Sequence, residues 1–151
     1  MYSEIPENQK THSTDSMNTL LLVSVSILTS LILDSFIEWA THRFPMHHKL
    51  PGMKFFFWHH VTVHHSHFSG SNYHHHDSKV RGEILFPFWV PPLLIGTATA
   101  PYALASFLLE NWRPFYCSLG VALCYYIAFE GFHQLMHLPD SPVVRFIRES
   151  N

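Results

Sequence analysis

The amino-acid sequence predicts an all-α protein, an integral membrane bundle of about three transmembrane helices. Only 13% of the residues are charged, while 47% are apolar and 15% are aromatic. In soluble domains about a quarter of all residues are charged, so this chain lacks the ionic surface of a soluble protein. The apolar residues also gather in long stretches without charge. The formal net charge of -2 gives no electrostatic reason to expect nucleic acid as a partner.

The chain divides into a tail and one membrane domain. Residues 1–15 are polar and mixed in charge, which predicts a flexible N-terminal tail. Residues 16–33 carry no charge over eighteen positions, enough for a first span. The acidic flank and the lack of a small-residue cleavage site favour an uncleaved anchor over a signal peptide. Residues 16–151 are therefore expected to form the membrane domain.

Two more apolar stretches follow. Residues 84–109 contain four prolines, which predicts a kinked span starting after Pro92, or a broken one. Residues 110–113 form a short polar turn, and residues 114–129 form the third stretch. Pro114 suits the first turn of that last helix.

The basic residues predict the orientation in the membrane. Five of them lie in the connection after the first span, against one in the tail, so the connection should face the cytosol. Three spans then return residues 130–137 to the same cytosolic side. The five are Arg43, Lys49, Lys54, Lys79 and Arg81.

Histidine is the unusual residue of this chain. There are 14 histidines, and eleven of them lie between His42 and His76. His42 and His47 are five residues apart with Pro45 between them. Because proline disfavours helix at the residue before it, we expect the helix to end near Phe44 and His47 to fold back toward His42.

Two further histidine pairs have the spacing of one helix face. His60 and His64 are four residues apart, and so are His133 and His137. His65 should point about 100° away from His64, so that one helix serves two metal ions. Pairs at this spacing are a common way for a helix to bind a metal.

These clusters predict a metal centre. A single histidine near an apolar surface is more often a hydrogen-bonded core residue, but burying many imidazoles without partners costs about 1–3 kcal/mol for each. Imidazole suits iron, zinc, copper and nickel, and the two cysteines lie apart from the histidines in an apolar run. Structural zinc needs only four ligands, so a two-metal centre fits better. The candidate ligands are His42, His47, His60, His64, His65, His133 and His137.

Two carboxylates precede histidines by about one helical turn. Glu38 stands before His42, and Glu130 stands before His133. Each is a candidate acceptor for the N–H group of a ligand imidazole, which would fix the orientation of that ring. The alternative is a carboxylate on the helix surface. His76 is a further candidate neighbour of the ligands.

Three segments carry a resemblance to a known family. EWATHRFPMHH, HVTVHH and EGFHQLMHLPDSP resemble, in this order, the first three histidine boxes of the fatty acid hydroxylase and sterol desaturase superfamily. The resemblance spans residues 36–143 and includes the proline-bearing apolar hairpin between the second and third boxes. Each box alone is weak, whereas the ordered trio in a membrane protein is specific.

The resemblance implies a membrane non-haem di-iron oxidoreductase that uses O2 to hydroxylate or desaturate a lipid in lipid biosynthesis. By motif position, the seven histidines above would hold two Fe ions. The sequence has no HPGG haem signature and no glycine-rich nucleotide fingerprint, so electrons would come from an external donor such as cytochrome b5 and its reductase. In a eukaryote, the endoplasmic reticulum is the implied location, with the metal site facing the cytosol.

The sequence departs from the family pattern in two ways. Family members carry a fourth histidine box, which is missing before Asn151, so we expect an incomplete domain that holds one or both irons poorly and has little or no activity by itself. His74, His75 and His76 are the only substitutes. The second box has three residues between His60 and His64, which leaves His59 as an alternative ligand.

Two other functions stay open at this point. One is a membrane zinc hydrolase acting on a lipid, in which Glu38 or Glu130 is the base that activates water. The other is an inactive metal-binding fragment. Zinc without oxygen consumption in the active form would favour the hydrolase over the oxidoreductase.

Overall fold

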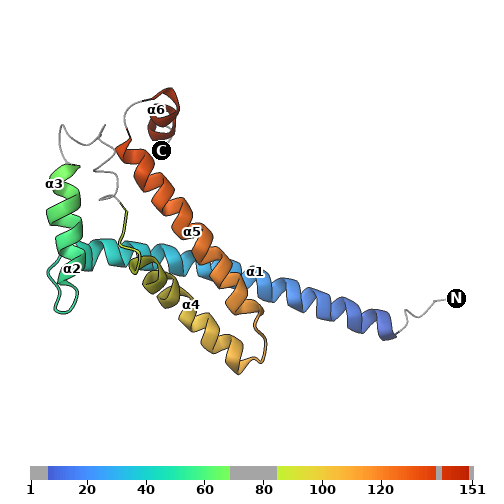
Figure 1. Cartoon of the computed structure of the whole chain (residues 1–151). Helices are drawn as coiled ribbons and strands as arrows, with labels where there is room; N and C mark the ends of the chain where they lie inside the picture. The colour runs from blue at the N-terminus through green and yellow to red at the C-terminus, as the bar shows by residue number, and fades with distance from the viewer. Residues whose placement is uncertain (1–6, 69–84, 139–140, 150–151) are drawn as a thin grey trace.

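The computed structural model describes residues 7–68, 85–138 and 141–149, and its regular elements are all helical (Figure 1). No strand occurs among these residues, so the predicted all-α class is confirmed. Three long helices form the bundle, namely α1 (Glu7–Thr41), α4 (Val90–Leu108) and α5 (Arg113–His137). The short elements are η1 (His42–Met46), α2 (Lys54–Phe57), η2 (Trp58–His64), α3 (His65–His67) and α6 (Pro142–Glu149).

The three long helices pack through small and polar side chains. Ser106, Ser118 and Ala122 are buried between them, which lets the backbones approach closely. The hydroxyl of Tyr102 on α4 donates a hydrogen bond to Oγ1 of Thr29 on α1 over 2.8 Å. Each of the three helices contacts the other two. Contacts through small and polar side chains are typical of helices that pack together in a membrane, because their large apolar side chains face outward.

The turn between α4 and α5 follows from local chemistry. Glu110 adopts a left-handed φ of 50°, which reverses the chain. The N–H of Asn111 donates to the carbonyl of Ser106 (3.0 Å), and the N–H of Phe115 donates to the Ser106 hydroxyl (3.0 Å). Pro114 lies in the first turn of α5. The predicted turn and the predicted place of this proline are both confirmed.

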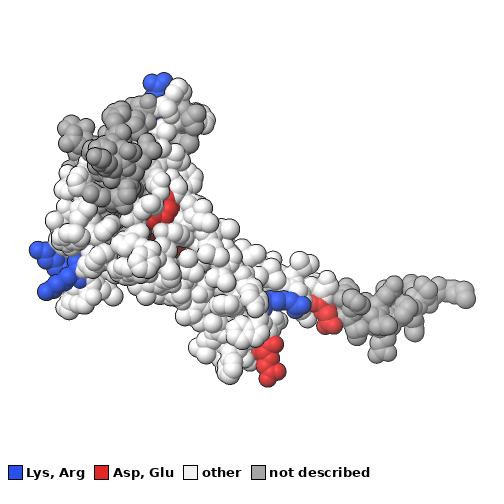
Figure 2. Space-filling model, viewed as in Figure 1, with Lys and Arg blue, Asp and Glu red and all other residues white. Residues whose placement is uncertain are grey.

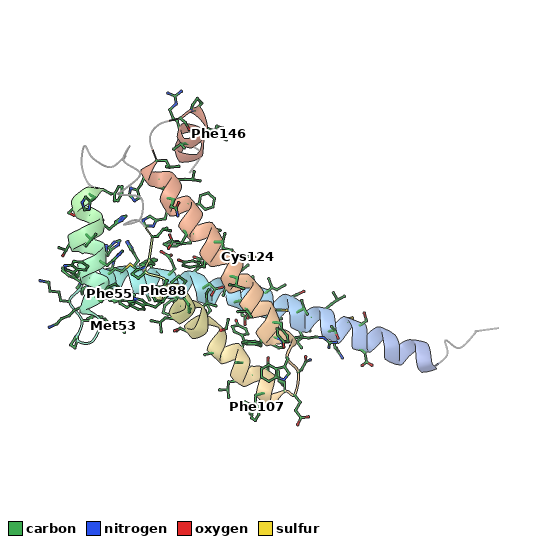
Figure 3. All side chains as sticks on the ribbon, viewed as in Figure 1. Met53, Phe55, Phe88, Phe107, Cys124 and Phe146 are labelled. Atoms are coloured by element: carbon green, nitrogen blue, oxygen red, sulfur yellow. The ribbon has the colours of Figure 1, made fainter. Side chains whose placement is uncertain are left out.

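Two helical stretches are long and apolar enough to cross a membrane, by length and composition. They are Asp15–Met46 and Arg113–His137. Large apolar side chains on them face outward: Leu20 is 66% exposed and Ile127 is 68% exposed. Figure 2 shows few charged side chains over the middle of the bundle, and Figure 3 shows Phe107 projecting away from it. Such a surface suits lipid better than water.

The helix α4 is not one of these two stretches. It is 19 residues long and contains Pro91, Pro92 and Pro101. It begins at Val90, slightly before the expected start after Pro92. A third transmembrane span therefore remains a prediction.

Two predicted boundaries differ from the structure. The tail predicted for residues 1–15 is helical from Glu7 onward, because adding residues to an existing helix costs little once its first turns have formed. The α-helix ends at Thr41 and continues as one π-helical turn to Met46, whereas the end was expected near Phe44. Pro45 has no N–H to donate, and the wider turn accommodates it.

The ends of three segments meet at one end of the molecule. These are η1 after α1, the segment from η2 to α3, and the C-terminal end of α5. The start of α4 lies at the same end, where the Trp89 ring packs 5.0 Å from that of Phe55. The convergence of the histidine clusters is therefore confirmed, while the side of the membrane on which they lie remains a prediction.

Candidate metal centre

Six of the seven predicted ligands form two groups that could each hold a metal ion. In both groups, one ligand atom from each histidine lies within 4.8 Å of the other two. We name them the first group and the second group. The first consists of His42, His47 and His60, and the second of His64, His133 and His137.

The first group joins η1 to η2. All three pairs of its ring centroids are 4.9 Å apart, and the rings meet edge to face. His42 and His47 come from either end of the π-turn that contains Pro45, and His60 comes from the facing segment. The fold-back of His47 toward His42 is thus confirmed. Two members are exposed and only His60 is buried.

The second group joins η2 to α5. The ring of His64 lies 5.0 Å from that of His133 and 4.9 Å from that of His137. His133 and His137 are one turn apart on α5, with their rings 5.2 Å from each other. Phe68 is 2% exposed and its ring lies 4.4 Å from that of His137, so it forms an apolar wall beside the group.

His65 lies between the two groups. Its ring centroid is 4.7 Å from that of His60 and 5.5 Å from that of His64, one member of each group. It also lies 5.6 Å from the ring of His47. One helical segment therefore contributes to both groups, but it does so through His60 and His64, which were predicted to share one face, and not through His64 and His65.

Local backbone geometry produces this division. His60 and His64 lie in the π-helix η2, and their rings stack at 5.3 Å with 10° between the planes. A π-turn is wider than an α-turn and is frequent at functional sites. Both histidine-bearing segments between the long helices contain such turns. The sequence pattern predicted a regular helix for His60–His64 and did not show this widening.

Burial favours the neutral form of the imidazoles of His60, His64 and His65. It lowers the pKa of His60 and that of His64 to about 3, and neighbouring histidines contribute further to both shifts. Burial also lowers the pKa of His65. A neutral imidazole has a free lone pair, which metal binding requires.

Two ring nitrogens are buried without a hydrogen-bond partner among the described residues. They are Nε2 of His60 and Nδ1 of His133, one from each group. An unpartnered buried nitrogen costs about 1–3 kcal/mol, which metal coordination would offset. The donor set consists of imidazoles, and iron and zinc both accept it. The residues present therefore fit a pair of metal ions.

The two candidate carboxylates lie in long helices, Glu38 in α1 and Glu130 in α5. Glu38 lines a cavity beside His42, and Glu130 is 6% exposed and accepts a 2.9 Å hydrogen bond from the Tyr126 hydroxyl. No hydrogen bond joins either carboxylate to a histidine ring in the part of the chain that the structure describes. Their proposed role as acceptors for ligand N–H groups remains a prediction.

The remaining histidines lie outside both groups. The ring of His59 lies 5.7 Å from that of Phe55, so the structure places His60 in the first group in its stead. Nδ1 of His48 is 3.0 Å from the Arg43 carbonyl, and Nδ1 of His67 is 3.0 Å from the Val63 carbonyl. His12 and His74–His76, including the candidate His76, lie outside the described side chains.

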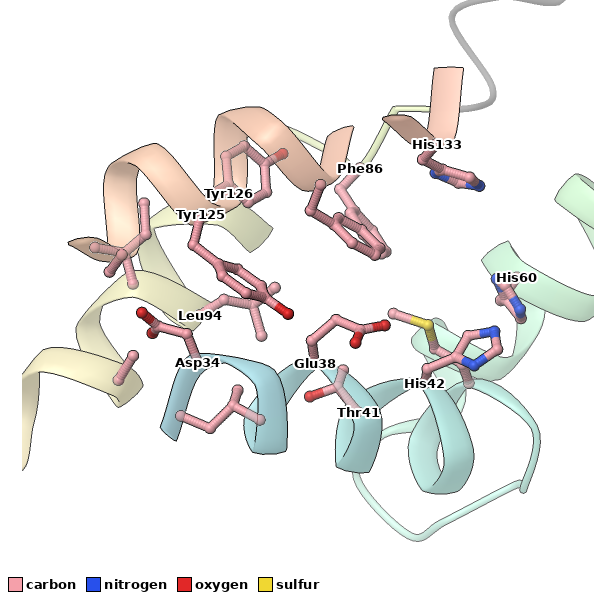
Figure 4. Close-up of a pocket in the computed structure, with 16 residues that line it drawn as sticks. Asp34, Glu38, Thr41, His42, His60, Phe86, Leu94, Tyr125, Tyr126 and His133 are labelled. Atoms are coloured by element: carbon pink, nitrogen blue, oxygen red, sulfur yellow. The ribbon is translucent and has the colours of Figure 1, made fainter. Parts of the chain in front are cut away.

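A cavity of about 260 Å³ adjoins the histidines (Figure 4). Its walls are mostly apolar, and three histidines from both groups line one end, namely His42, His60 and His133. Asp34, which the sequence reading missed, lines the cavity together with Glu38. The signal was present, because Asp34, Glu38 and His42 repeat every four residues and so share one face of α1.

Comparison with known proteins finds no similar protein. No family model, no curated protein and no solved structure matches the chain. The protein is an all-helical bundle with two helices able to cross a membrane and two histidine groups able to hold metal ions.

Proposed function

We propose that this protein is a membrane non-haem di-iron oxidoreductase that uses O2 to hydroxylate or desaturate a lipid. The proposal includes membership of the fatty acid hydroxylase and sterol desaturase superfamily, which its three histidine boxes resemble. The observation that carries it is the pair of adjacent trihistidine groups beside an apolar cavity. An unactivated C–H bond resists side-chain acids and bases, so oxidising power must come from metal and oxygen.

Each of the two histidine groups would hold one metal ion. The first group would hold one ion and the second group the other, with His65 available to either. His60 and His64 lie in one helical segment with their rings stacked, so the two histidines would hold neighbouring ions. When bound, the irons would supply oxygen activation.

The cavity supports a lipid substrate. His42, His60 and His133 lie at one end of it, and apolar side chains from α1, α4 and α5 form most of its wall. Among them are Ile37, Leu94 and Phe129. These side chains would exclude water and hold an alkyl or ring segment against the histidines. The outward apolar surface of α1 and α5 would place the protein where such substrates dissolve.

Electron supply and orientation form part of the same proposal. Lys49 and Lys54 are exposed near the histidine end of the molecule, where they could receive an acidic donor such as cytochrome b5. Their positive charge also favours the cytosolic side of a membrane, and the endoplasmic reticulum is the location proposed for a eukaryote.

The test is oxygen consumption by the iron-loaded protein. The chain is purified in detergent, reconstituted with Fe²⁺ under argon, and mixed with a chemical reductant and a lipid extract before oxygen is admitted. We expect slow oxygen uptake that depends on the lipid, with a hydroxylated or desaturated lipid detected by mass spectrometry. The His60→Ala/His64→Ala double variant, which removes one ligand from each group, should show neither.

The same assay separates the oxidoreductase from a zinc hydrolase. Zinc at full occupancy, lipid hydrolysis and no oxygen uptake would replace the proposal with the hydrolase. A protein that binds iron and yet leaves every lipid unchanged would refute the catalytic proposal, leaving a metal-binding function.

A further inference from the structure

The cavity has a polar end that the metal chemistry does not use. Asp34 and Glu38 lie on successive turns of α1 and both line the cavity; Asp34 lies at the end away from His60 and His133, and Glu38 lies between Asp34 and His42 (Figure 4). Tyr125 lines the cavity opposite them. The remaining wall is largely apolar, so the presence of two carboxyl groups in it calls for an explanation.

Asp34 is buried with an unsatisfied oxygen. The side chain is 7% exposed, and its Oδ2 has no hydrogen-bond partner among the described residues. A carboxyl group in apolar surroundings is costly unless something donates a hydrogen bond to it. Because Asp34 lines the cavity, a molecule inside the cavity can supply that donor.

The charge of this end restricts the ligand. Two carboxyl groups four residues apart on one helix face accept hydrogen bonds and, when ionised, repel anions. An alcohol or an amine satisfies them, whereas a fatty acid carboxylate does not. An ether or a hydrocarbon of equal size offers no donor.

We propose that the cavity binds one lipid by a hydroxyl or amine group held at Asp34, with its apolar body running toward the histidines. His42 follows Asp34 by eight positions, at the point where α1 continues into η1, so a rise of 1.5 Å per residue places the donor about 12 Å from the first group. The distance between Asp34 and the histidines would thereby determine which carbon of the lipid lies at the metal site. This inference rests on the proposed function only for the reaction at the histidine end; the binding itself does not depend on it.

The test measures binding without turnover. The iron-loaded chain in detergent is kept under argon without reductant, and equilibrium binding is measured for hexadecanol, hexadecylamine, methyl hexadecyl ether and hexadecanoate. We expect the alcohol or the amine to bind about ten-fold or more tightly than the ether, and hexadecanoate to bind least. Which of the two donors is preferred identifies the polar group. Equal binding of alcohol, amine and ether would overturn the proposal.

Three variants localise the effect. Asp34→Leu should bring the alcohol and the amine down to the affinity of the ether. Asp34→Asn keeps an acceptor oxygen at the same size, so it should retain alcohol binding and weaken amine binding. Ser30→Ala is the matched control, because Ser30 is buried one turn earlier on the same face and does not line the cavity. Wild-type selectivity in Asp34→Leu would overturn the proposal, and loss of selectivity in Ser30→Ala would count against it.

Iron content is measured on each sample to keep the two proposals separate. Donor selectivity that depends on Asp34 in a protein that binds no iron would sustain this inference and contradict the di-iron function. Iron binding with oxygen uptake but no donor selectivity would do the reverse. Should Asp34→Leu fail to fold, the four ligands on the wild-type protein and on Asp34→Asn still decide the question.

Discussion

The two trihistidine groups differ in how the protein encloses them. The first group has two exposed members, His42 and His47, and depends on the π-turn around Pro45 to bring them together. The second group has two buried members, His64 and His137, and lies against Phe68. Burial both excludes water and favours neutral imidazole, so the second group is the better prepared of the two to bind a metal.

One pattern of spaced histidines thus produces two groups that differ in how deeply they are buried. The second group takes two ligands from a single turn of the long helix α5, whose packing against α1 and α4 fixes their positions. The first group takes two ligands from the short segment that follows α1. We therefore expect the first group to release its ion sooner than the second group.

The largest effect is expected from removing one ligand of either group. His137→Ala should abolish the ion of the second group, and His42→Ala that of the first, because two imidazoles hold a metal far less tightly than three. The loss of affinity should exceed the roughly 10–100-fold that follows removal of an outer hydrogen-bond partner. Metal analysis of the purified variants measures this.

His48→Ala is the control for both ligand variants. His48 is close in sequence to the first group, but its ring is directed to the carbonyl of Arg43, 3.0 Å away. Its removal should leave the metal content unchanged. Unchanged metal in His42→Ala and in His137→Ala alike would contradict the assignment of both groups.

The second effect concerns the wall of the second group. Phe68→Ala removes a side chain that is 2% exposed, and such truncations cost about 3–5 kcal/mol. The opening should let a chelator strip the second group as fast as the first, which dialysis against EDTA followed by metal analysis would detect. Phe132→Ala on α5 is the control, because Phe132 is 56% exposed and its loss should cost about 0.5 kcal/mol or less. A chelation rate in Phe68→Ala equal to that of the wild type would show that Phe68 does not protect the second group.

The third and smallest effect concerns the π-turn. Pro45→Ala restores a backbone N–H and allows a regular α-helix, which would turn His47 away from His42. We expect the affinity of the first group to fall about ten-fold, in the range that follows when a ligand is misoriented, with the second group unchanged. Titration of the apo-protein with Fe²⁺ resolves the two steps. Equal weakening of both steps would mean that Pro45 stabilises the whole bundle and not one group.

Much of this site could be predicted from spacing alone. The four-residue pair His133/His137 and the proline between His42 and His47 indicated which rings would come together, and six of the seven proposed ligands form the two groups. The spacing of Asp34, Glu38 and His42 also indicated a polar face on α1, although it was overlooked. Long apolar stretches predicted the helices because length and lack of charge are properties of the sequence itself.

Other features depended on tertiary context. No local pattern distinguishes the π-helix η2 from an α-helix, so the assignment of His60 and His64 to different groups was not predictable. The burial of Phe68 against His137 joins residues far apart in the chain. The helical stretch before Asp15 was missed because its polar composition resembles that of a loose tail, whereas its attachment to a long apolar helix extends the helix outward.

The most direct test of the central claim is anomalous X-ray diffraction at the iron edge from crystals of the iron-loaded protein. We predict two peaks in each chain, one about 2 Å from ring nitrogens of the first group and one about 2 Å from ring nitrogens of the second. Histidine rings that remain clustered while both peaks lie elsewhere, or are missing, would contradict the account.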